Sequence, residues 1–463
     1  MTSPASFAAL PLPPQVLANL ERLGYLEMTP VQAAALPAAL AGRDLIVQAR
    51  TGSGKTAAFA LAMLDKLNPR HFGAQALVLC PTRELAEQVA QETRRLARAE
   101  DNIKVLTLVG GAPIRAQLAS LEHGAHVLVG TPGRVLDLLE REALDLSGLR
   151  TLVLDEADRM LDMGFIEDMK AVAERCPRTR QTLLFSATYP EDIARLAQRF
   201  LREPERVTIA EAASAAGIEQ VWYEVAEDER LHAVGRLLRH HRPERTLAFC
   251  NTRQQCRDLV EVLAAEGVEA LALHGELEQR ERDQVLIRFA NRSLPVLVAT
   301  DVAARGLDIA QLECVVNVDV TPEPEVHVHR IGRTGRAGEA GLALNLASME
   351  EMGRVGRIEQ MQGTETVWHK LDELGPGDER PLVAPMVTLQ ILGGRKEKIR
   401  AGDVLGALTK DLGFAGAQVG KIAVTDQSTY VAVDRAIADK AVARLNGGMV
   451  KGRKVRVRRL DEA

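Results

Sequence analysis

Eight residues near the N-terminus have the types and spacing needed to hold a chain of phosphates. Ala49-Arg50-Thr51-Gly52-Ser53-Gly54-Lys55-Thr56 follow the apolar run 45–47 and precede the helix-like run 57–64. In a strand–turn–helix arrangement, glycines let backbone N–H groups face an anion, and the helix N-terminus adds the positive end of its dipole. Lys55 would reach the outer phosphates and the Thr56 hydroxyl would bind Mg²⁺. The usual pattern begins with Gly where this chain has Ala49, and a glycine-rich surface turn is the competing interpretation.

A second group of candidates is acidic and also follows an apolar run. Thr151–Leu154 leads directly into Asp155-Glu156-Ala157-Asp158. Ligands of open α/β sheets bind beyond the carboxyl ends of the strands, so these carboxylates would lie near the phosphates. Asp155 would hold the metal through water, and Glu156 would orient and polarise an attacking water. An acidic cap between a strand and a helix is the alternative, and the Lys55-Thr56 pair favours nucleotide hydrolysis over it.

Both groups lie in a chain that alternates short apolar runs with longer helical patterns. The predicted strands are 45–47, 76–80, 105–109, 126–129, 151–154 and 181–185 in a domain over 1–210, then 246–249, 269–273, 296–299, 314–318 and 341–346 in a domain over 218–372. Continuous apolar strands separated by helices predict parallel sheets covered on both faces. Turn-forming or soft segments at 211–217 and 374–381 are the expected linkers. The remaining residues, 386–460, have a β–α–β–β–α–β pattern, so the expected fold class is α/β with a C-terminal α+β domain.

Composition excludes several classes of protein. The 463 residues are 46% hydrophobic and 26% charged, which is ordinary for soluble globular proteins. The net charge of −5 gives no overall attraction to nucleic acid, but Lys and Arg outnumber Asp and Glu over 386–463. The five cysteines form no CxxC pair, which favours free thiols in a reducing compartment and argues against zinc. We expect neither a signal peptide nor a membrane span, and therefore a cytoplasmic protein.

The acidic box identifies a family when it is taken together with other blocks of the chain. Asp155-Glu156-Ala157-Asp158 spells the box that names the DEAD-box RNA helicases, and the remaining blocks resemble that family in order. The matching blocks are Phe7 with 24–32, 81–86, 110–111, 131–134, 186–188, 249–252, 274–275, 300–308 and 329–336. The resemblance covers about Phe7 to Gln362. Ala49 is normal for this family, whereas Met28 stands where the family often has Pro.

The resemblance implies two tandem RecA-like domains that bind ATP-Mg²⁺ and RNA where they close on each other. Phe7, Tyr25 and Gln32 would form the adenine-reading segment, since an amide such as that of Gln32 can bond to adenine N6 and N7 together. Asp308 would contact the ribose. With these residues, the nucleotide site would comprise Thr51, Gly52, Ser53, Gly54, Lys55 and Thr56.

The same resemblance assigns residues that sense or stabilise the reacting phosphate. Arg333 and Arg336 are three apart, on one face if helical, and would act as arginine fingers. Solvent-exposed arginines in a glycine-rich loop are the alternative. Ser186 and Thr188 would couple the state of the γ-phosphate to the domain interface, although a plain turn is not excluded. His327 and His329 stand two apart with no third ligand nearby, which is weak support for zinc.

The expected RNA contacts of the core are rich in Gly, Thr and Arg rather than in aromatic residues. Such groups bind phosphate and sugar, which positions a strand without reading its sequence, and contacts to the 2′-OH could favour RNA over DNA. By resemblance, the contacts are Arg83, Gly111, Thr131, Arg134, Thr252, Gly275 and Thr300.

The basic C-terminal region resembles an RNA-recognition (RRM-like) fold, specifically the C-terminal domain of DbpA-type bacterial DEAD-box proteins. Val455 and Val457 alternate with Lys454, Arg456 and Arg458, so one face of a strand would be apolar and the other basic. We expect Tyr430 and the three basic residues to contact RNA, mainly through charge and RNA shape, because the usual aromatic signature is missing. A solvated basic surface without a ligand is the alternative.

The function implied is an RNA-stimulated ATPase that separates short RNA duplexes. Its DbpA-type relatives dock on a hairpin of the large-subunit (23S) ribosomal RNA, which implies a role in assembly of the large ribosomal subunit. Two other classes remain open: a DNA-directed motor of the wider helicase superfamily, and an ATP-gated RNA clamp or annealing chaperone that does not separate strands.

Overall fold

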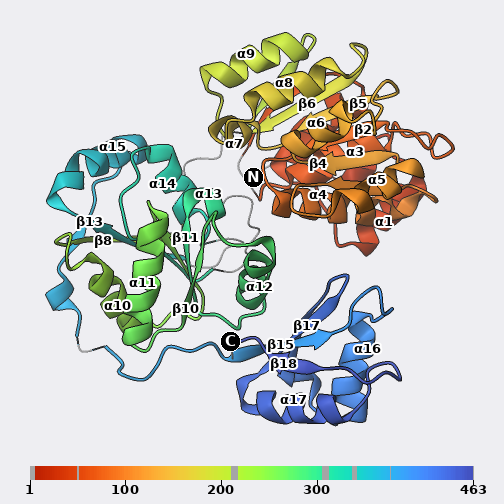
Figure 1. The fold of residues 1–463 in the computed structure, drawn as a ribbon. Coiled ribbons are helices and arrows are strands. Elements are labelled where there is room, and N and C mark those ends of the chain that lie inside the picture. The colour runs from red at the N-terminus through yellow and green to blue at the C-terminus, as the bar shows by residue number, and fades with distance from the viewer. Residues whose placement is uncertain are drawn as a thin grey trace. The chain divides into compact units, whose positions relative to one another are not determined.

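The computed structural model describes residues 6–49, 52–209, 217–304, 312–335, 341–375 and 377–461 (Figure 1). The chain divides into two compact units that separate between the strands β7 and β8. It contains two seven-stranded sheets and one four-stranded sheet. The prediction of two α/β sheets followed by a small α+β domain is therefore confirmed. No helix in these ranges has the length and apolar character that crossing a bilayer requires.

The first unit is built on a parallel sheet whose strand order is β3-β4-β2-β5-β6-β1-β7. Its strands are β1 (Leu45–Gln48), β2 (Ala76–Leu79), β3 (Val105–Leu108), β4 (Val127–Gly130), β5 (Thr151–Leu154), β6 (Gln181–Ser186) and β7 (Glu205–Thr208). Leu45 and Val47 of β1 belong to one buried cluster and Ile46 to another. Because successive side chains of a strand point to opposite faces, both faces of this sheet are buried, as the continuous apolar runs predict.

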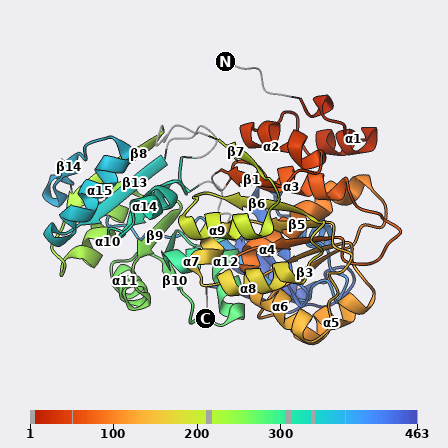
Figure 2. The ribbon, with the colours of Figure 1, turned by 90° about the horizontal axis from the view of Figure 1, so that it is seen from above.

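Helices cover each of these two faces (Figures 1 and 2). They are α1 (Pro14–Arg22), α2 (Pro30–Leu40), α3 (Lys55–Leu64), α4 (Arg83–Leu96), α5 (Ile114–Glu122), α6 (Pro132–Glu140), α7 (Ala157–Asp162), α8 (Ile166–Glu174) and α9 (Glu191–Phe200). Side chains of α1 to α4, such as Phe59 and Val89, pack with Leu45 and Val47. Side chains of α6 to α9, such as Met160 and Ile193, pack with Ile46.

The second unit begins with another parallel sheet, ordered β10-β11-β9-β12-β13-β8-β14. Its strands are β8 (Ile218–Glu224), β9 (Thr246–Cys250), β10 (Ala270–Leu273), β11 (Val296–Thr300), β12 (Cys314–Asn317), β13 (Gly341–Ala347) and β14 (Trp368–His369). Its helices are α10 (Arg230–His241), α11 (Arg253–Ala265), α12 (Gln279–Ala290), α13 (Asp301–Ala304), α14 (Pro324–Ile331) and α15 (Met352–Gln362). The order of this sheet repeats that of the first sheet position by position, so β8 takes the place of β1.

The C-terminal part of the second unit is an antiparallel sheet with the order β16-β17-β15-β18. Its elements are β15 (Met386–Leu392), α16 (Ala401–Gly406) with a π-helical turn over Ala407–Asp411, β16 (Val419–Val424), β17 (Ser428–Asp434), α17 (Ala438–Gly447) and β18 (Val457–Arg459). Val387, Leu389 and Ile391 of β15 pack with Leu408 and Leu445 from the helices. The predicted β–α–β–β–α–β order is present.

Candidate functional site

The phosphate loop lies between β1 and α3, as predicted, and its described part starts at Gly52. Gly52 and Gly54 have φ angles of 85° and 93°, in the left-handed region that glycine adopts without strain. A Cβ atom on Gly54 would lie 2.7 Å from Gln32 Nε2 and 2.9 Å from Thr29 Oγ1. The loop therefore approaches the start of α2 more closely than any side chain allows. Thr51 lies outside the described residues.

Lys55 and the two acidic candidates line one pocket of about 430 Å³. Lys55 is 6% exposed, and Asp155 and Glu156 are 3% exposed. Within the described part of the chain, Lys55 Nζ and Asp155 Oδ1 are buried and have no hydrogen-bond partner. Burial, together with the charge of Glu156, raises the pKa of Asp155 to about 6, although Lys55 opposes this shift. A buried ammonium and a buried carboxylate oxygen without partners fit a phosphate chain and its bound cation.

Glu156 is held in an unusual backbone conformation beside an arginine. Its φ and ψ are 53° and 52°, a left-handed geometry that a non-glycine residue rarely adopts and that is often found at functional sites. Arg159, one turn along α7, places Nη1 3.1 Å from Glu156 Oε2, and both side chains are buried. Arg159 is not among the predicted site residues, because an Arg in the first turn of a helix carries no distinctive pattern.

Asp158 connects the acidic box to the predicted coupling residues. Its Oδ2 accepts hydrogen bonds from Ala187 N at 3.1 Å, Thr188 N at 2.9 Å and Thr188 Oγ1 at 3.0 Å. Its own N–H donates to Ser186 Oγ at 3.2 Å. The structure thus brings Ser186 and Thr188 onto the acidic box, through a carboxylate that is absent from the predicted site residues. Asp158 could be recognised in the sequence as part of the acidic box, but its hydrogen-bond partners could not be predicted.

The three adenine-reading candidates, Gln32, Tyr25 and Phe7, differ in whether they line the pocket. Gln32 is 1% exposed, and its Oε1 accepts from Thr29 N at 3.0 Å while its Nε2 donates to Gly54 O at 3.1 Å. This amide caps α2 and ties it to the phosphate loop, and Gln32 is not among the side chains that line the pocket. Its contact with adenine stays a prediction. Tyr25 does line the pocket. Phe7 is 3% exposed and packs edge-on against the Tyr25 ring, so it supports that ring from the core.

The predicted RNA contacts of the first unit gather at one edge of its sheet. Arg83, Gly111 and Thr131 follow β2, β3 and β4, which are neighbours, and Arg134 lies in the first turn of α6. A Cβ atom on Gly111, whose φ is 71°, would lie 1.8 Å from Arg83 Nη1, so the guanidinium rests directly on this glycine. Arg134 Nη1 donates to Ala112 O at 3.4 Å.

Their counterparts in the second unit occupy the same places in its sheet. Thr252, Gly275 and Thr300 lie at or after the carboxyl ends of β9, β10 and β11, which are also neighbours. Thr252 caps α11 by accepting from Gln255 N at 3.1 Å. Arg330, which sequence reasoning did not single out, is 1% exposed and donates to Asp301 at 2.8 and 2.7 Å.

Of the two predicted arginine fingers, Arg333 lies within the described residues and is not in a helix. The helix α14 ends at Ile331, and Arg333, 6% exposed, lies in the turn that follows. Arg336 and Asp308 lie outside the described residues.

His327 stacks on Trp222 with ring centroids 5.4 Å apart. No group of three or more His, Cys, Asp or Glu side chains is placed to hold a metal ion within the ranges that the structure describes.

In the C-terminal sheet, the basic residues and Tyr430 differ in exposure. Lys454, Arg456 and Arg458 are exposed while Val455 and Val457 are buried, as the alternation predicts. Tyr430 is only 6% exposed, and its hydroxyl accepts from Gln390 Nε2 at 3.3 Å. The prediction that Tyr430 contacts RNA does not agree with this position, because a buried ring presents little of its face to a base.

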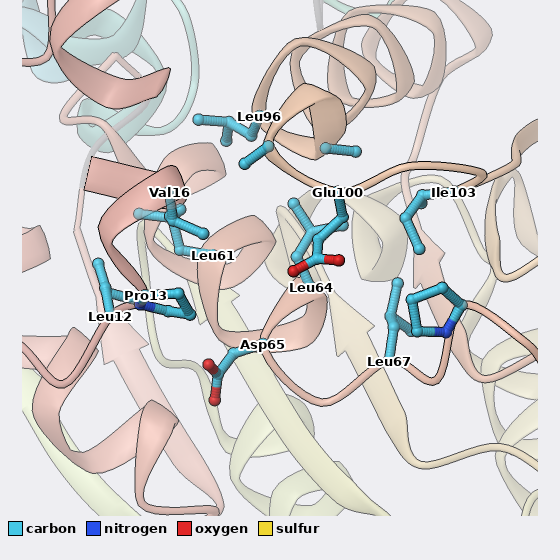
Figure 3. A pocket seen from close by; sticks show the side chains of 13 residues that line it. Leu12, Pro13, Val16, Leu61, Leu64, Asp65, Leu67, Leu96, Glu100 and Ile103 are labelled. Carbon is cyan, nitrogen blue, oxygen red and sulfur yellow. The ribbon is translucent and has the colours of Figure 1, made fainter. Parts of the chain in front are cut away.

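A second pocket of the first unit, about 110 Å³ in volume, has a different character (Figure 3). Aliphatic side chains such as Leu12, Val16 and Leu61 form its walls, and the carboxylates of Asp65 and Glu100 are its charged groups. Its lining includes no Lys or Arg side chain and no glycine, so it has no groups suited to binding a phosphate. The larger pocket is therefore the candidate active site.

Three family models match successive parts of the chain. They describe a DEAD/DEAH box helicase over residues 29–196, a helicase conserved C-terminal domain over 229–338 and a DbpA RNA binding domain over 388–459. The first two contain the phosphate loop, the acidic box and the RNA-contact blocks. The third covers the four-stranded sheet except the first two residues of β15.

Relatives and solved structures agree with these matches. The chain is 53% identical to the ATP-dependent RNA helicase DbpA of Escherichia coli over 451 residues, covering 97% of this chain and 98% of that protein. It is 46% identical to the DEAD-box ATP-dependent RNA helicase CshA of Streptococcus pneumoniae, covering 71% of this chain and 62% of that protein. The structure of S. cerevisiae Dbp5 bound to RNA and ADP BeF3 matches with a TM-score of 0.71 at 30% identity, covering 80% of this chain and 96% of that chain. The chain therefore belongs to the DEAD-box ATP-dependent RNA helicases, and within them to the DbpA type.

Proposed function

We propose that this chain hydrolyses ATP in an RNA-stimulated reaction and separates short RNA duplexes. The observation that carries the proposal is the continuous connection from the phosphate site to the coupling residues. Lys55 and Asp155 lie buried in one pocket, and Asp158 of the same acidic box binds Thr188 through two hydrogen bonds. A change at the γ-phosphate would therefore be transmitted to the segment that follows β6.

The residues of the first unit divide the work of hydrolysis. Lys55 would hold the outer phosphates, and Thr56 and Asp155 would hold Mg²⁺, which when bound would neutralise charge on the phosphates. Glu156 would orient the attacking water and accept its proton, while Arg159 holds the carboxylate in place at 3.1 Å. Arg333 and Arg336 remain proposed groups for stabilising transition-state charge. The five cysteines are free and buried, which supports placing the protein in the reducing cytoplasm.

We further propose that the C-terminal domain directs the enzyme to 23S ribosomal RNA during assembly of the large subunit. The core contacts come from glycines, hydroxyls and arginines, which position a strand but do not read its bases. Specificity then rests on the C-terminal domain, where the exposed Lys454 and Arg456 precede β18 and the exposed Arg458 lies within it; we call these three residues the basic strip. We leave Tyr430 out of this surface because its ring is buried.

The proposal is tested by measuring ATP hydrolysis and strand separation with three nucleic acids. These are a 23S ribosomal RNA fragment, an unrelated RNA duplex and a DNA duplex of the same sequence as the RNA. We expect the ribosomal fragment to stimulate most and DNA least. Equal stimulation by DNA would favour a DNA-directed motor, and RNA-dependent hydrolysis without strand separation would favour a clamp or annealing chaperone.

Variants of the full chain test the residues assigned to ATP hydrolysis and those assigned to RNA preference. Glu156→Gln should abolish turnover; unwinding at a normal turnover rate by this variant would contradict the role given to Glu156. Lys454→Glu with Arg456→Glu should remove the preference for the ribosomal fragment and leave stimulation by unrelated RNA unchanged. Lys440→Glu, an exposed charge on α17 in the same domain, is the matched control. An unchanged preference for the ribosomal fragment in the double variant would refute the assignment of the basic strip. Truncation of the chain after residue 384 should remove this preference in the same way as the double variant.

A further inference from the structure

The nucleotide pocket extends from the phosphate loop to a stretch of α4 that none of the predicted site residues occupies. At one end are Lys55, Asp155 and Glu156, which act on the phosphates. At the other end, Tyr25 meets Glu92 and Arg95 of α4. Gln88 and Gln91 of α4 line the pocket as well, and Gln32 is bonded to Thr29 and Gly54. Tyr25, Glu92 and Arg95 differ from these amides because they are linked to one another by a hydrogen bond and an ion pair.

The Tyr25 ring is fixed at two points. Its hydroxyl donates a hydrogen bond of 2.7 Å to Glu92 Oε1, and Glu92 Oε2 pairs with Arg95 Nη1 at 2.7 Å. The Phe7 ring packs edge-on against the body of the Tyr25 ring, with centroids 6.2 Å apart and planes at 87°. Burial and the neighbouring Glu92 carboxylate raise the pKa of Tyr25, so the hydroxyl remains a donor throughout the neutral range.

Glu92 is suited to fixing the Tyr25 hydroxyl because its own carboxylate is paired with Arg95 and is largely buried. The side chain of Glu92 is 18% exposed, whereas that of Arg95 is 41% exposed. Arg95 thus takes Oε2 of the carboxylate and leaves Oε1 to Tyr25. Hydrogen bonds to a charged, partly shielded acceptor are stronger than those between neutral groups.

We propose that Glu92 is a positioning residue for the nucleotide: by fixing the Tyr25 ring, it pre-forms the surface on which the adenine base stacks. The inference rests on the proposed ATP site and adds a residue to its base end. An aromatic ring that is already in place loses less freedom when a base stacks on it, so the contact contributes more to affinity. Glu92 acts through Tyr25 and does not touch the reacting phosphate.

The test compares nucleotides with and without a base, using the full chain. Tyr25→Phe and Glu92→Ala should each raise the KM for ATP by about tenfold or more, as expected for the loss of one hydrogen bond to a charged group, with kcat nearly unchanged. Because both variants break the same contact, the double variant should be no weaker than the weaker single variant. Glu92→Gln, which keeps an acceptor oxygen, should restore most of the affinity. Inhibition by inorganic tripolyphosphate, which has no base, should be the same in all variants.

Controls separate this inference from simple destabilisation. Glu174→Ala breaks the surface pair between Glu174 and Arg199 in the same unit and should leave KM unchanged. The inference is overturned if both single variants bind ATP normally, if their effects multiply in the double variant, or if tripolyphosphate binding weakens in parallel with ATP binding. A wild-type chain that does not hydrolyse ATP would instead refute the proposed function itself.

Discussion

The contact between Asp158 and Thr188 allows the proposed coupling of ATP hydrolysis to strand separation to be tested by small changes. Thr188→Val keeps the shape of the side chain and removes only the Oγ1 donor, which lies 3.0 Å from Asp158 Oδ2. The carboxylate is 6% exposed and keeps its two backbone donors on this oxygen, Ala187 N and Thr188 N. We expect a loss of about 1–2 kcal/mol in the stability of this segment, since one hydrogen bond to a charged acceptor is removed.

Asp158→Asn should have a larger effect because an amide has one acceptor oxygen where the carboxylate uses two. Asp158 Oδ1 accepts from Arg159 N at 3.1 Å, and Oδ2 accepts the three donors of 187–188. An amide at this position leaves one of these sets facing an NH₂ group, which costs about 2–4 kcal/mol. The loss of stability caused by Thr188→Val should then be smaller in the Asp158→Asn background than in the wild type.

Hydrogen exchange measured by mass spectrometry observes these bonds directly, through the amides of Ala187 and Thr188. We expect faster exchange there in both variants, while the ATP turnover rate stays within about twofold and fewer strands are separated per ATP hydrolysed. Ser120→Ala, which removes a hydroxyl bonded to Ala116 O on α5 of the same unit, is the control. Unchanged exchange at 187–188, or unwinding that falls only in proportion to ATP turnover, would refute the reasoning.

Two other predictions follow from the geometry. Gly54→Ala places a methyl group 2.7 Å from Gln32 Nε2 at a φ of 93°, so ATP binding measured by titration should weaken more than about tenfold. Gly164→Ala, at a φ of 78° with open space around its Cβ in the same unit, is the matched left-handed control. Burial, together with the nearby charge of Arg330, lowers the pKa of His327 to about 3, below its unfolded value. The stability from this neutral histidine is full above about pH 6.5 and is lost as the pH falls towards 3, which amounts to about 2 kcal/mol at pH 5. Urea unfolding followed by tryptophan fluorescence, to which Trp222 and Trp368 contribute, should show this loss in the wild type and not in His327→Gln. An equal pH dependence of stability in both proteins would contradict the prediction.

The strands and the order of the domains could be predicted from the sequence where burial is continuous. Runs such as Ala76–Leu79 and residues 296–299 of β11 are apolar throughout because both faces of a parallel sheet are covered. The edge strand β7 (Glu205–Thr208) was not predicted, since only Val207 of its four residues is buried. The two-residue β14 is too short to produce a pattern, and β8 alternates exposed and half-buried residues before its apolar end.

The blocks of the site could be predicted one by one, but not their contacts. Asp158 and Thr188 are 30 residues apart and meet because β5 and β6 are neighbours in the sheet. Tyr25 and Glu92 are 67 residues apart and meet through the packing of α4 on the first sheet. Single residues of common type carry no signal of such partners. Gln32 shows the converse case, in which a correctly identified block uses its amide for capping and for the phosphate loop.

The repeated strand order of the two sheets bears on the stoichiometry of the enzyme. β8 stands in the place of β1, yet the residues after it, Val225-Ala226-Glu227-Asp228-Glu229, contain no glycine and no lysine. The second sheet thus keeps the frame of a nucleotide-binding domain without its phosphate loop. One chain should accordingly bind a single ATP and titrate with a one-site isotherm. Under the proposed function, it should release one phosphate for each round of RNA binding and release.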